Sequence, residues 1–487
     1  MNSSRLRVLF VTSEAYPLVK TGGLGDVCYA LPNALRQLDV DVRLLLPGYS
    51  AVLERLSLVE VHDNINVYPL LEPIRLLVGI MPGEVTPVYV VDCPSLYQRD
   101  GGPYQDITGK DWDDNAIRFG ILSKIAALFG EHKFLFKPQI IHCNDWQTAI
   151  TPAWLAFSDQ AYAKTIMSVH NMAYQGIFGA ETVEKIGLPP ESFSMFGLEF
   201  YGKLSFLKAG IYYANQITTV SPNYAKDIQT PNYGCGLDTL LTERQYKLTG
   251  ILNGIDSEVW NPDTDIHLNR NYSAGNISAK VRNTQALRNK LNLANSKQIP
   301  LIGMITRLTE QKGIDLVIPI IPMLIKAGVQ IAILGSGDKT LEMHLQRLEA
   351  KYPKQMSVTI GYDEKLSHQI EAGANMFLMP SKFEPCGLNQ MYSMSYGTIP
   401  IVRRTGGLAD TVTDATPENI QNKIATGFIF ERSNANELLH CIERAIKIFH
   451  NKEIWKQLQI TGMTRDFSWQ KSAKQYISLY HHSINTI

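Results

Sequence analysis

The stretch that decides the fold is residues 7–38, which read RVLFVTSEAYPLVKTGGLGDVCYALPNALRQL. The run Arg7–Val11 is almost continuously apolar, which is typical of a strand buried on both faces of a parallel sheet. Beyond Gly22-Gly23, apolar residues return every three or four positions through Leu38, which predicts one apolar face of a helix. Pro32 predicts either a kink in that helix or its early end. The stretch therefore predicts a strand, a glycine turn and a helix.

The same pattern recurs along the chain and predicts an α/β fold, because strands that alternate with helical patterns form βαβ units. Residues 253–280 interrupt it with a stretch rich in Asn, Asp, Pro and Ser, typical of an irregular connection. We therefore expect two doubly wound, Rossmann-like domains facing each other across a cleft. The further short apolar runs are Val42–Leu46, Val88–Val91, Ile140–His142, Thr165–Val169, Ile217–Val220, Leu301–Ile305, Gln330–Leu334, Val358–Ile360, Met376–Met379 and Ile399–Val402.

Composition narrows the possible function. The 487 residues carry 46 Lys+Arg against 46 Asp+Glu, so the net charge is zero and no basic surplus favours a nucleic acid or an acidic membrane. A hydrophobic content of 45% with 19% charged residues excludes a disordered chain. No apolar stretch is long enough to span a membrane. The six cysteines are scattered without a C-x-x-C motif, which indicates a reducing compartment and neither a disulfide scaffold nor a zinc site.

Ligands of open α/β sheets bind outside the carboxyl ends of the strands, so the residues that follow each apolar run are the candidates for function. Two glycine pairs, Gly22-Gly23 and Gly406-Gly407, each stand between a strand and a helix. Backbone N–H groups there can approach an anion closely, and a helix N-terminus favours negative charge. A tight turn without a ligand explains each pair equally well, and neither loop matches a P-loop or a G-x-G-x-x-G motif.

Two cations follow the strand predicted at Leu301–Ile305, namely Arg307 and Lys312. A diphosphate leaving group bound without a metal needs such charges. One contact at ~4 Å contributes about 4 kcal/mol at an effective dielectric near 20, so both cations and a helix terminus are required to approach the ~8 kcal/mol that catalysis needs. The alternative is a solvated pair at a helix start.

Acidic and nucleophilic residues follow other strands. Glu384 lies in a turn rich in Pro, Gly and Cys. Cys386, in the same turn, is interpreted as a small buried thiol and not as a nucleophile, because the sequence nearby offers no activating base. Asp145 taken alone is an N-cap, and His170 taken alone is a core histidine. The close spacing of His142 to Asp145 does not predict a metal site.

Six ordered motifs across the whole chain resemble the glycogen and starch synthases of bacteria and plastids, which extend α-1,4-glucans with ADP-glucose. The motifs are Lys20–Val27 (KTGGLGDV), His170–Gly176 (HNMAYQG), Asn253–Asp256 (NGID), Arg307–Gly313 (RLTEQKG), Glu384–Leu388 (EPCGL) and Thr405–Val412 (TGGLADTV). The resemblance implies the GT-B fold. It predicts an acceptor-side domain at 1–247, a nucleotide-sugar domain at 248–462, and a C-terminal helix at 463–487 that crosses back to the first domain.

The resemblance also implies residue roles. The cations Arg307 and Lys312 stabilise the departing ADP, Glu384 holds glucose hydroxyls, and His170 with Asp145 lines the sugar and acceptor side. The expected donor- and substrate-binding residues are Lys20, Gly22, Gly23, Tyr104, Asn253, Tyr362, Cys386, Thr405, Gly406 and Gly407. Among these, Tyr362 is the expected adenine-stacking residue and Tyr104 a weaker candidate on the acceptor side.

These features predict a retaining hexosyltransferase that moves glucose from ADP-glucose to the non-reducing 4-hydroxyl of an α-1,4-glucan. No metal or other cofactor is expected, and the partners are ADP-glucose, ADP and the glucan, with no nucleic acid and no membrane. The expected compartment is the cytoplasm, or the plastid stroma in a plant. A UDP-glucose-using GT-B enzyme and a non-catalytic sugar-nucleotide or glucan-binding protein remain the alternatives. One departure is Asn144, where many bacterial members have His; it leaves the choice between glycogen and a starch-like product open.

Overall fold

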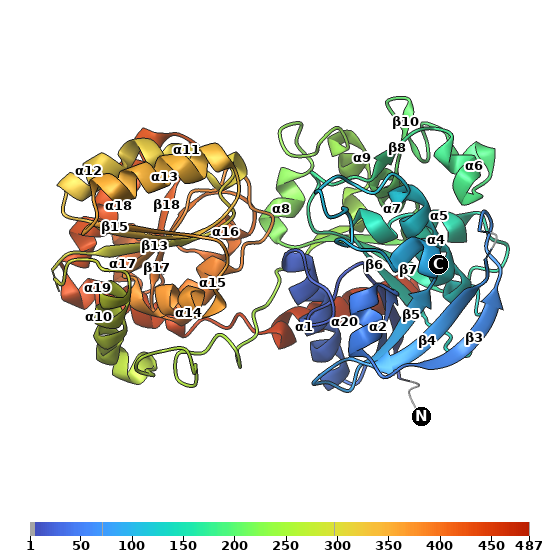
Figure 1. Cartoon of the computed structure of the whole chain (residues 1–487), viewed down its shortest axis with the longest axis horizontal. Coiled ribbons are helices and arrows are strands. Elements are labelled where there is room, and N and C mark those ends of the chain that lie inside the picture. Colours follow the sequence, from blue (N-terminus) through green and yellow to red (C-terminus); the bar gives the residue numbers. More distant parts are fainter. Residues whose placement is uncertain (1–4, 71, 297, 487) are drawn as a thin grey trace. The chain divides into compact units, whose positions relative to one another are not determined.

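The computed structural model describes residues 5–70, 72–296 and 298–486. The chain forms two compact units: unit 1 is Met1–Gly254 with Trp469–Ile487, and unit 2 is Ile255–Ser468. Each is an α/β body in which helices cover a central sheet (Figure 1). These divisions fall a few residues beyond the expected boundaries at 247/248 and 462/463.

The described part of unit 1 contains a nine-stranded sheet. Its pairings are parallel from β12 to β5 and antiparallel from β5 to β3. The strands, in spatial order, are β12 (Leu248–Gly250), β11 (Gln216–Thr219), β7 (Lys164–Val169), β6 (Ile140–Asn144), β1 (Arg7–Val11), β2 (Asp41–Pro47), β5 (Pro87–Asp92), β4 (Ile74–Ile80) and β3 (Val59–Ile65). A small antiparallel sheet joins β8 (Ile177–Phe178), β10 (Lys203–Ser205) and β9 (Glu199–Phe200).

All six strands predicted in the first half are confirmed. Their side chains are buried as continuous apolar runs require: Val8 to Val11 are wholly inaccessible in β1. The antiparallel strands β3 and β4 were not predicted, and β3 is exposed along most of its length.

Helix α1 (Gly23–Gln37) continues through Pro32, so the early end that this proline allowed does not occur. The other helices of unit 1 are α2 (Ser50–Arg55), α3 (Pro94–Tyr97), α4 (Asn115–Gly130), α5 (Thr151–Ala156), α6 (Thr182–Ile186), α7 (Phe206–Tyr213), α8 (Pro222–Asp227), α9 (Asp238–Glu243) and α20 (Trp469–Asn485). The C-terminal helix α20 packs against α1 (Figure 1). The hydroxyl of its Tyr480 lies 2.7 Å from Nδ1 of His142 on β6, so this helix is part of unit 1.

Unit 2 contains a sheet in which every described pairing is parallel. Its order is β15 (Met356–Ile360), β14 (Gln330–Gly335), β13 (Leu301–Ile305), β16 (Met376–Met379), β17 (Ile399–Arg403) and β18 (Phe428–Phe430). The five predicted strands are confirmed, and only β18 was missed among these six. The helices are α10 (Lys280–Lys290), α11 (Ile314–Val317), α12 (Ile321–Lys326), α13 (Lys339–Lys351), α14 (Glu364–Gly373), α15 (Asn389–Ser395), α16 (Gly406–Thr411), α17 (Pro417–Gln421), α18 (Ala435–Phe449) and α19 (Lys452–Met463).

The strand order of each sheet reverses at one point, and this is where an open α/β sheet binds its ligand. In unit 1 the reversal falls between β1 and β6: β2 and β5 follow on the β1 side, and β7, β11 and β12 follow on the β6 side. In unit 2 the reversal falls between β13 and β16. Residues after these four strands are therefore placed for function. No helix within the described residues is long and apolar enough to cross a bilayer.

Candidate active site

Asp145 follows β6 and anchors the segment that follows β7. Its backbone is in an unusual conformation, with φ of 55°. Its carboxylate accepts the backbone N–H of His170 at 2.7 Å and, more weakly, that of Asn171 at 3.4 Å. Asp145 occupies the N-cap position of the short helix η1 (Trp146–Thr148), as the N-cap interpretation predicted, but its side chain makes no capping hydrogen bond there. Burial raises the pKa of Asp145 to about 7, against the opposing effect of those two N–H donors.

His170 is positioned by the side chain of Asn144, the last residue of β6. The amide Nδ2 of Asn144 donates to the carbonyl of Val11 at 3.0 Å and to that of His142 at 3.3 Å, which turns Oδ1 toward His170. The distance from His170 Nε2 to this oxygen is 3.0 Å. Because Oδ1 can only accept, Nε2 carries the hydrogen and Nδ1 carries the lone pair. Burial lowers the pKa of His170 to about 4, so the ring is neutral near pH 7.

We expect Asn144→Asp to move the acid limb of the activity profile to higher pH. A carboxylate in place of Oδ1 stabilises the imidazolium form, which raises the pKa of His170 from about 4. His142, which is buried beside His170 and has its own pKa lowered to about 3, and Asp145, with a pKa of about 7, keep their side chains in this variant. The new carboxylate raises their pKa values in the same direction. Between pH 5 and 7 the variant therefore loses the lone pair on Nδ1, and activity falls there. The measurement is kcat/KM from pH 5 to 9; a limb that coincides with that of the wild type contradicts the role of Asn144.

Glu14, which follows β1, organises the first glycine loop. Its carboxylate accepts the backbone N–H and the hydroxyl of Thr21 at 2.5 and 2.6 Å, and the N–H of Gly22 at 3.3 Å. It also accepts a hydrogen bond from the hydroxyl of Tyr104. In the predicted phosphate loop, the N–H groups of Thr21 and Gly22 therefore already donate to a protein carboxylate. Gly23 is the first residue of α1, and no side chain caps this helix.

Two predicted residues of unit 1 have further partners. Lys20 forms an ion pair with Asp26 at 2.7 Å, and both side chains are more than one-third exposed. An exposed pair of this kind contributes little to stability, so Lys20 can exchange this carboxylate for a ligand anion at small cost. Asn253 is buried, and its Oδ1 has no hydrogen-bond partner among the described residues. An unpaired buried acceptor fits a position that binds a ligand or water donor.

In unit 2 the predicted residues gather around Glu384. Its Oε2 accepts hydrogen bonds from Lys312 Nζ at 2.6 Å and from Ser381 Oγ at 2.9 Å. Glu384 is only 6% exposed, so the carboxylate is held in one orientation by a cation and a hydroxyl. Arg307 is exposed and forms no ion pair with any described residue. Arg307 is therefore available to an anion, whereas the charge of Lys312 is already partly compensated.

The second glycine pair is required by packing against the turn that carries Glu384. Gly406 has φ of +42°, and a Cβ there would collide with the carbonyl oxygen of Glu384; a Cβ on Gly407 would collide with that of Cys386. The N–H of Gly407 donates to the carbonyls of Glu384 and Pro385 at 3.2 and 3.1 Å. Because the N–H of Gly407 already donates to two carbonyls, the interpretation of this glycine as part of a tight turn is correct for Gly407. Thr405 is buried at the start of α16, and Cys386 is a buried thiol as expected.

Tyr362 lies apart from this group, after β15, and its side chain is 77% exposed. An exposed ring suits the predicted stacking on a base. The structure thus gathers Asp145 with His170, joins Tyr104 to the first glycine loop through Glu14, and gathers Lys312, Cys386, Gly406 and Gly407 about Glu384.

Comparisons with known proteins agree with this arrangement. Residues 7–243 match the starch synthase catalytic domain, and residues 284–457 match the glycosyl transferases group 1. The glycogen synthase of Nitrosomonas eutropha is 52% identical over 98% of this chain and 96% of its own length. That of Aromatoleum aromaticum is 49% identical over 98% and 97%. The chain belongs to the glycogen and starch synthase family of glycosyltransferases.

A solved member of the glycogen and starch synthase family shares the fold. The catalytic domain of starch synthase IV from Arabidopsis thaliana, bound to ADP and acarbose, is 33% identical and superposes with a TM-score of 0.88 over 99% of this chain and 100% of its own. The predicted GT-B class is confirmed by this likeness. Sequence reasoning missed two positioning residues of this glycosyltransferase, Glu14 and Ser381. Glu14 follows β1 directly, so the strand-end rule already pointed to it.

Proposed function

We propose that the chain transfers glucose from ADP-glucose to the non-reducing 4-hydroxyl of an α-1,4-glucan with retention of configuration. The observation that carries the proposal is the likeness, along nearly the whole chain, to a starch synthase bound to ADP and acarbose. The chemistry of the site supports it, since cations and an oriented carboxylate follow the strands at the reversal point of unit 2. We also infer a cytoplasmic site of action, because all six cysteines are free thiols.

In the proposed mechanism the departing ADP assists the attack of the acceptor hydroxyl on the same face of the sugar. Arg307 and Lys312 stabilise the negative charge that develops on ADP, and Glu384 holds glucose hydroxyls while positive charge develops on the sugar. The acceptor hydroxyl then attacks from the face that ADP leaves. His170 accepts a hydrogen bond from a sugar hydroxyl through Nδ1, and Asp145 keeps its backbone in place. The protein therefore contributes orientation and electrostatic stabilisation.

Activity should not depend on a divalent metal, because Lys20, Arg307 and Lys312 supply positive charge for the diphosphate. We expect the initial rate after treatment with EDTA and gel filtration to stay within about 20% of the untreated rate, a difference of roughly 0.1 kcal/mol. The measurement is transfer of labelled glucose with and without added Mg²⁺. A large loss that Mg²⁺ restores contradicts this prediction.

The deciding experiment compares labelled ADP-glucose with labelled UDP-glucose, each with and without glycogen primer. Incorporation from ADP-glucose into glycogen is the expected result. Preference for UDP-glucose supports the alternative donor. Incorporation from neither donor, together with measurable binding of ADP, supports a non-catalytic binding protein.

A further inference from the structure

The last residue of β17, Arg403, is a buried cation that the proposed mechanism does not use. It is 7% exposed, whereas the side chain of the next residue, Arg404, is 46% exposed and forms an ion pair with Glu431 at 2.7 Å. An arginine is rarely buried unless its guanidinium is paired or hydrogen-bonded, because taking the charge out of water costs free energy. The partners of Arg403 therefore indicate which part of the structure its burial stabilises.

The guanidinium of Arg403 donates to backbone carbonyls in the segments that follow the two neighbouring strands. After β16 it donates from Nε to the carbonyl of Ser381 at 2.9 Å and from Nη2 to that of Lys382. After β18 it donates from Nη1, more weakly, to the carbonyl of Glu431 at 3.4 Å. The pairing of β16 with β17 ends before Ser381, so the side chain of Arg403 holds backbone that the sheet no longer holds.

The segment after β16 carries a hydrogen-bond donor of the candidate site. Ser381, whose carbonyl accepts from Nε of Arg403, donates from its own Oγ to Glu384 Oε2 at 2.9 Å. Residues 381–384 lie in the irregular segment between β16 and α15, so the place of this hydroxyl depends on how its backbone is held. Arg403 is thus connected to the Glu384 carboxylate through Ser381.

A second connection leads from the same segment to Lys312. The N–H of Lys382, whose carbonyl accepts from Nη2 of Arg403, donates to the carbonyl of Gln311 at 2.8 Å. Gln311 directly precedes Lys312, whose Nζ donates to Glu384 Oε2 at 2.6 Å. Both connections begin at Arg403 and end on the same carboxylate oxygen. The two members of the Lys312–Glu384 pair therefore depend on backbone that Arg403 holds.

From these contacts we infer that Arg403 is a positioning residue of the transfer reaction, which acts through Ser381 and Lys382 to keep the Lys312–Glu384 pair in place. The inference rests on the proposed function for the reaction that this pair serves. Reacting groups must be held to within about 0.5 Å, and a displacement of about 1 Å can lower a rate about 100-fold. Lysine is a poor substitute at position 403, because an ammonium on a flexible stem lacks the planar fork that directs several N–H donors at once.

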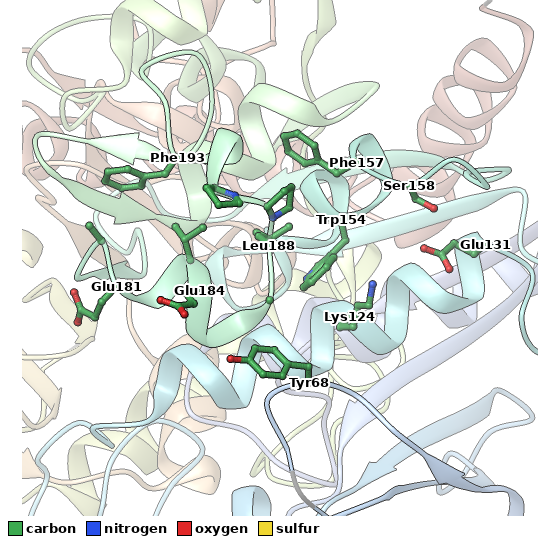
Figure 2. Close-up of a pocket in the computed structure, with 15 residues that line it drawn as sticks. Tyr68, Lys124, Glu131, Trp154, Phe157, Ser158, Glu181, Glu184, Leu188 and Phe193 are labelled. Atoms are coloured by element: carbon green, nitrogen blue, oxygen red, sulfur yellow. The ribbon is translucent and has the colours of Figure 1, made fainter.

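The test compares Arg403→Lys with Arg404→Lys in the full chain, because the two arginines are adjacent and Arg404 pairs with Glu431 at the surface. A second control, Lys124→Met, removes a partly buried cation from the wall of a cavity in unit 1, where its ammonium lies 3.8 Å from the centre of the Trp154 ring (Figure 2). The readouts are kcat for transfer of labelled glucose from ADP-glucose to maltotriose, and the stoichiometry and affinity of ADP binding by calorimetry.

We expect Arg403→Lys to lower kcat about tenfold, while it binds one ADP per chain as the wild type does. Both controls should match the wild type in kcat and in ADP binding. A kcat of Arg403→Lys equal to that of Arg404→Lys overturns the inference.

A double-mutant cycle separates positioning from a merely structural role. In a chain that already carries Glu384→Ala, Arg403→Lys should change kcat less than about twofold, because the carboxylate that Arg403 positions is gone. A further loss of about tenfold in that background overturns the inference. If Arg403→Lys binds no ADP, Arg403→Gln, which places no charge in the buried position, is measured in the same way. Loss of ADP binding in this variant also overturns the inference, because it would assign Arg403 to the fold alone.

The failure of the proposed function looks different. The wild type would then transfer no glucose from either donor. The inference fails by itself when the wild type is active and Arg403→Lys is equally active.

Discussion

Replacing Glu384 by alanine should lower kcat about 100-fold or more and leave the affinity for ADP nearly unchanged. The Glu384 residue is 6% exposed and its carboxylate is held by Lys312 and Ser381, so the carboxylate is pre-oriented before any sugar arrives. Fixed charges of this kind act strongly in a water-poor site and need no reorganisation during the reaction. A 100-fold loss corresponds to about 2.7 kcal/mol of transition-state stabilisation.

The measurement is kcat from labelled ADP-glucose, with ADP affinity determined by calorimetry. Ser381→Ala is the matched control, because it removes one of the two hydrogen bonds to the same carboxylate and leaves the charge in place. Its expected loss is smaller, on the order of tenfold, or about 1.4 kcal/mol. If Glu384→Ala retains activity within about threefold of the wild type, roughly 0.7 kcal/mol, Glu384 has no central role.

The parallel strands were predictable because a strand that is buried on both faces has a nearly continuous run of apolar residues. Arg7–Val11 and Met376–Met379 are short, mostly apolar runs close to turn residues, and such runs are typical of buried strands. The strand Val59–Ile65 has no such apolar run, since it pairs antiparallel at the sheet edge and exposes most of its side chains. Its pairing with β4 is also interrupted by two shifts in register.

The candidate site was predictable as a set of positions but not as a set of contacts. The strand-end rule placed Asp145 and Glu384 correctly at the reversal points, because topology alone decides which residues emerge there. It could not show that Asp145 holds the backbone of His170, since the two are far apart in sequence. Nor could it show that Glu14 takes the N–H groups of Thr21 and Gly22, where a ligand phosphate was expected. Such pairings depend on side-chain directions that only the folded chain determines.

Lys312→Ala should lower kcat/KM about 100-fold or more, and its effect should not add to that of Glu384→Ala. Lys312 Nζ and Glu384 Oε2 are 2.6 Å apart and both side chains are largely buried, at 17% and 8% exposure. Removing one partner leaves the other charge uncompensated in a poorly hydrated place, which costs about 3–5 kcal/mol in comparable buried pairs. The same change removes one of the two cations proposed to stabilise ADP, so binding and turnover both suffer.

The effects should not add because either substitution already removes the Lys312–Glu384 interaction, so the second substitution has no further interaction of this kind to remove. The double variant should therefore be no more than about tenfold slower than the slower single variant, roughly 1.4 kcal/mol. Lys339→Ala is the control for loss of a lysine–glutamate pair in the same unit: Lys339 lies 2.8 Å from Glu342 on α13, away from Glu384, and its side chain is 82% exposed while that of Glu342 is 7% exposed. Its kcat/KM should equal that of the wild type. Full additivity in the Lys312 and Glu384 cycle would mean that the two residues act independently, and it would contradict this prediction.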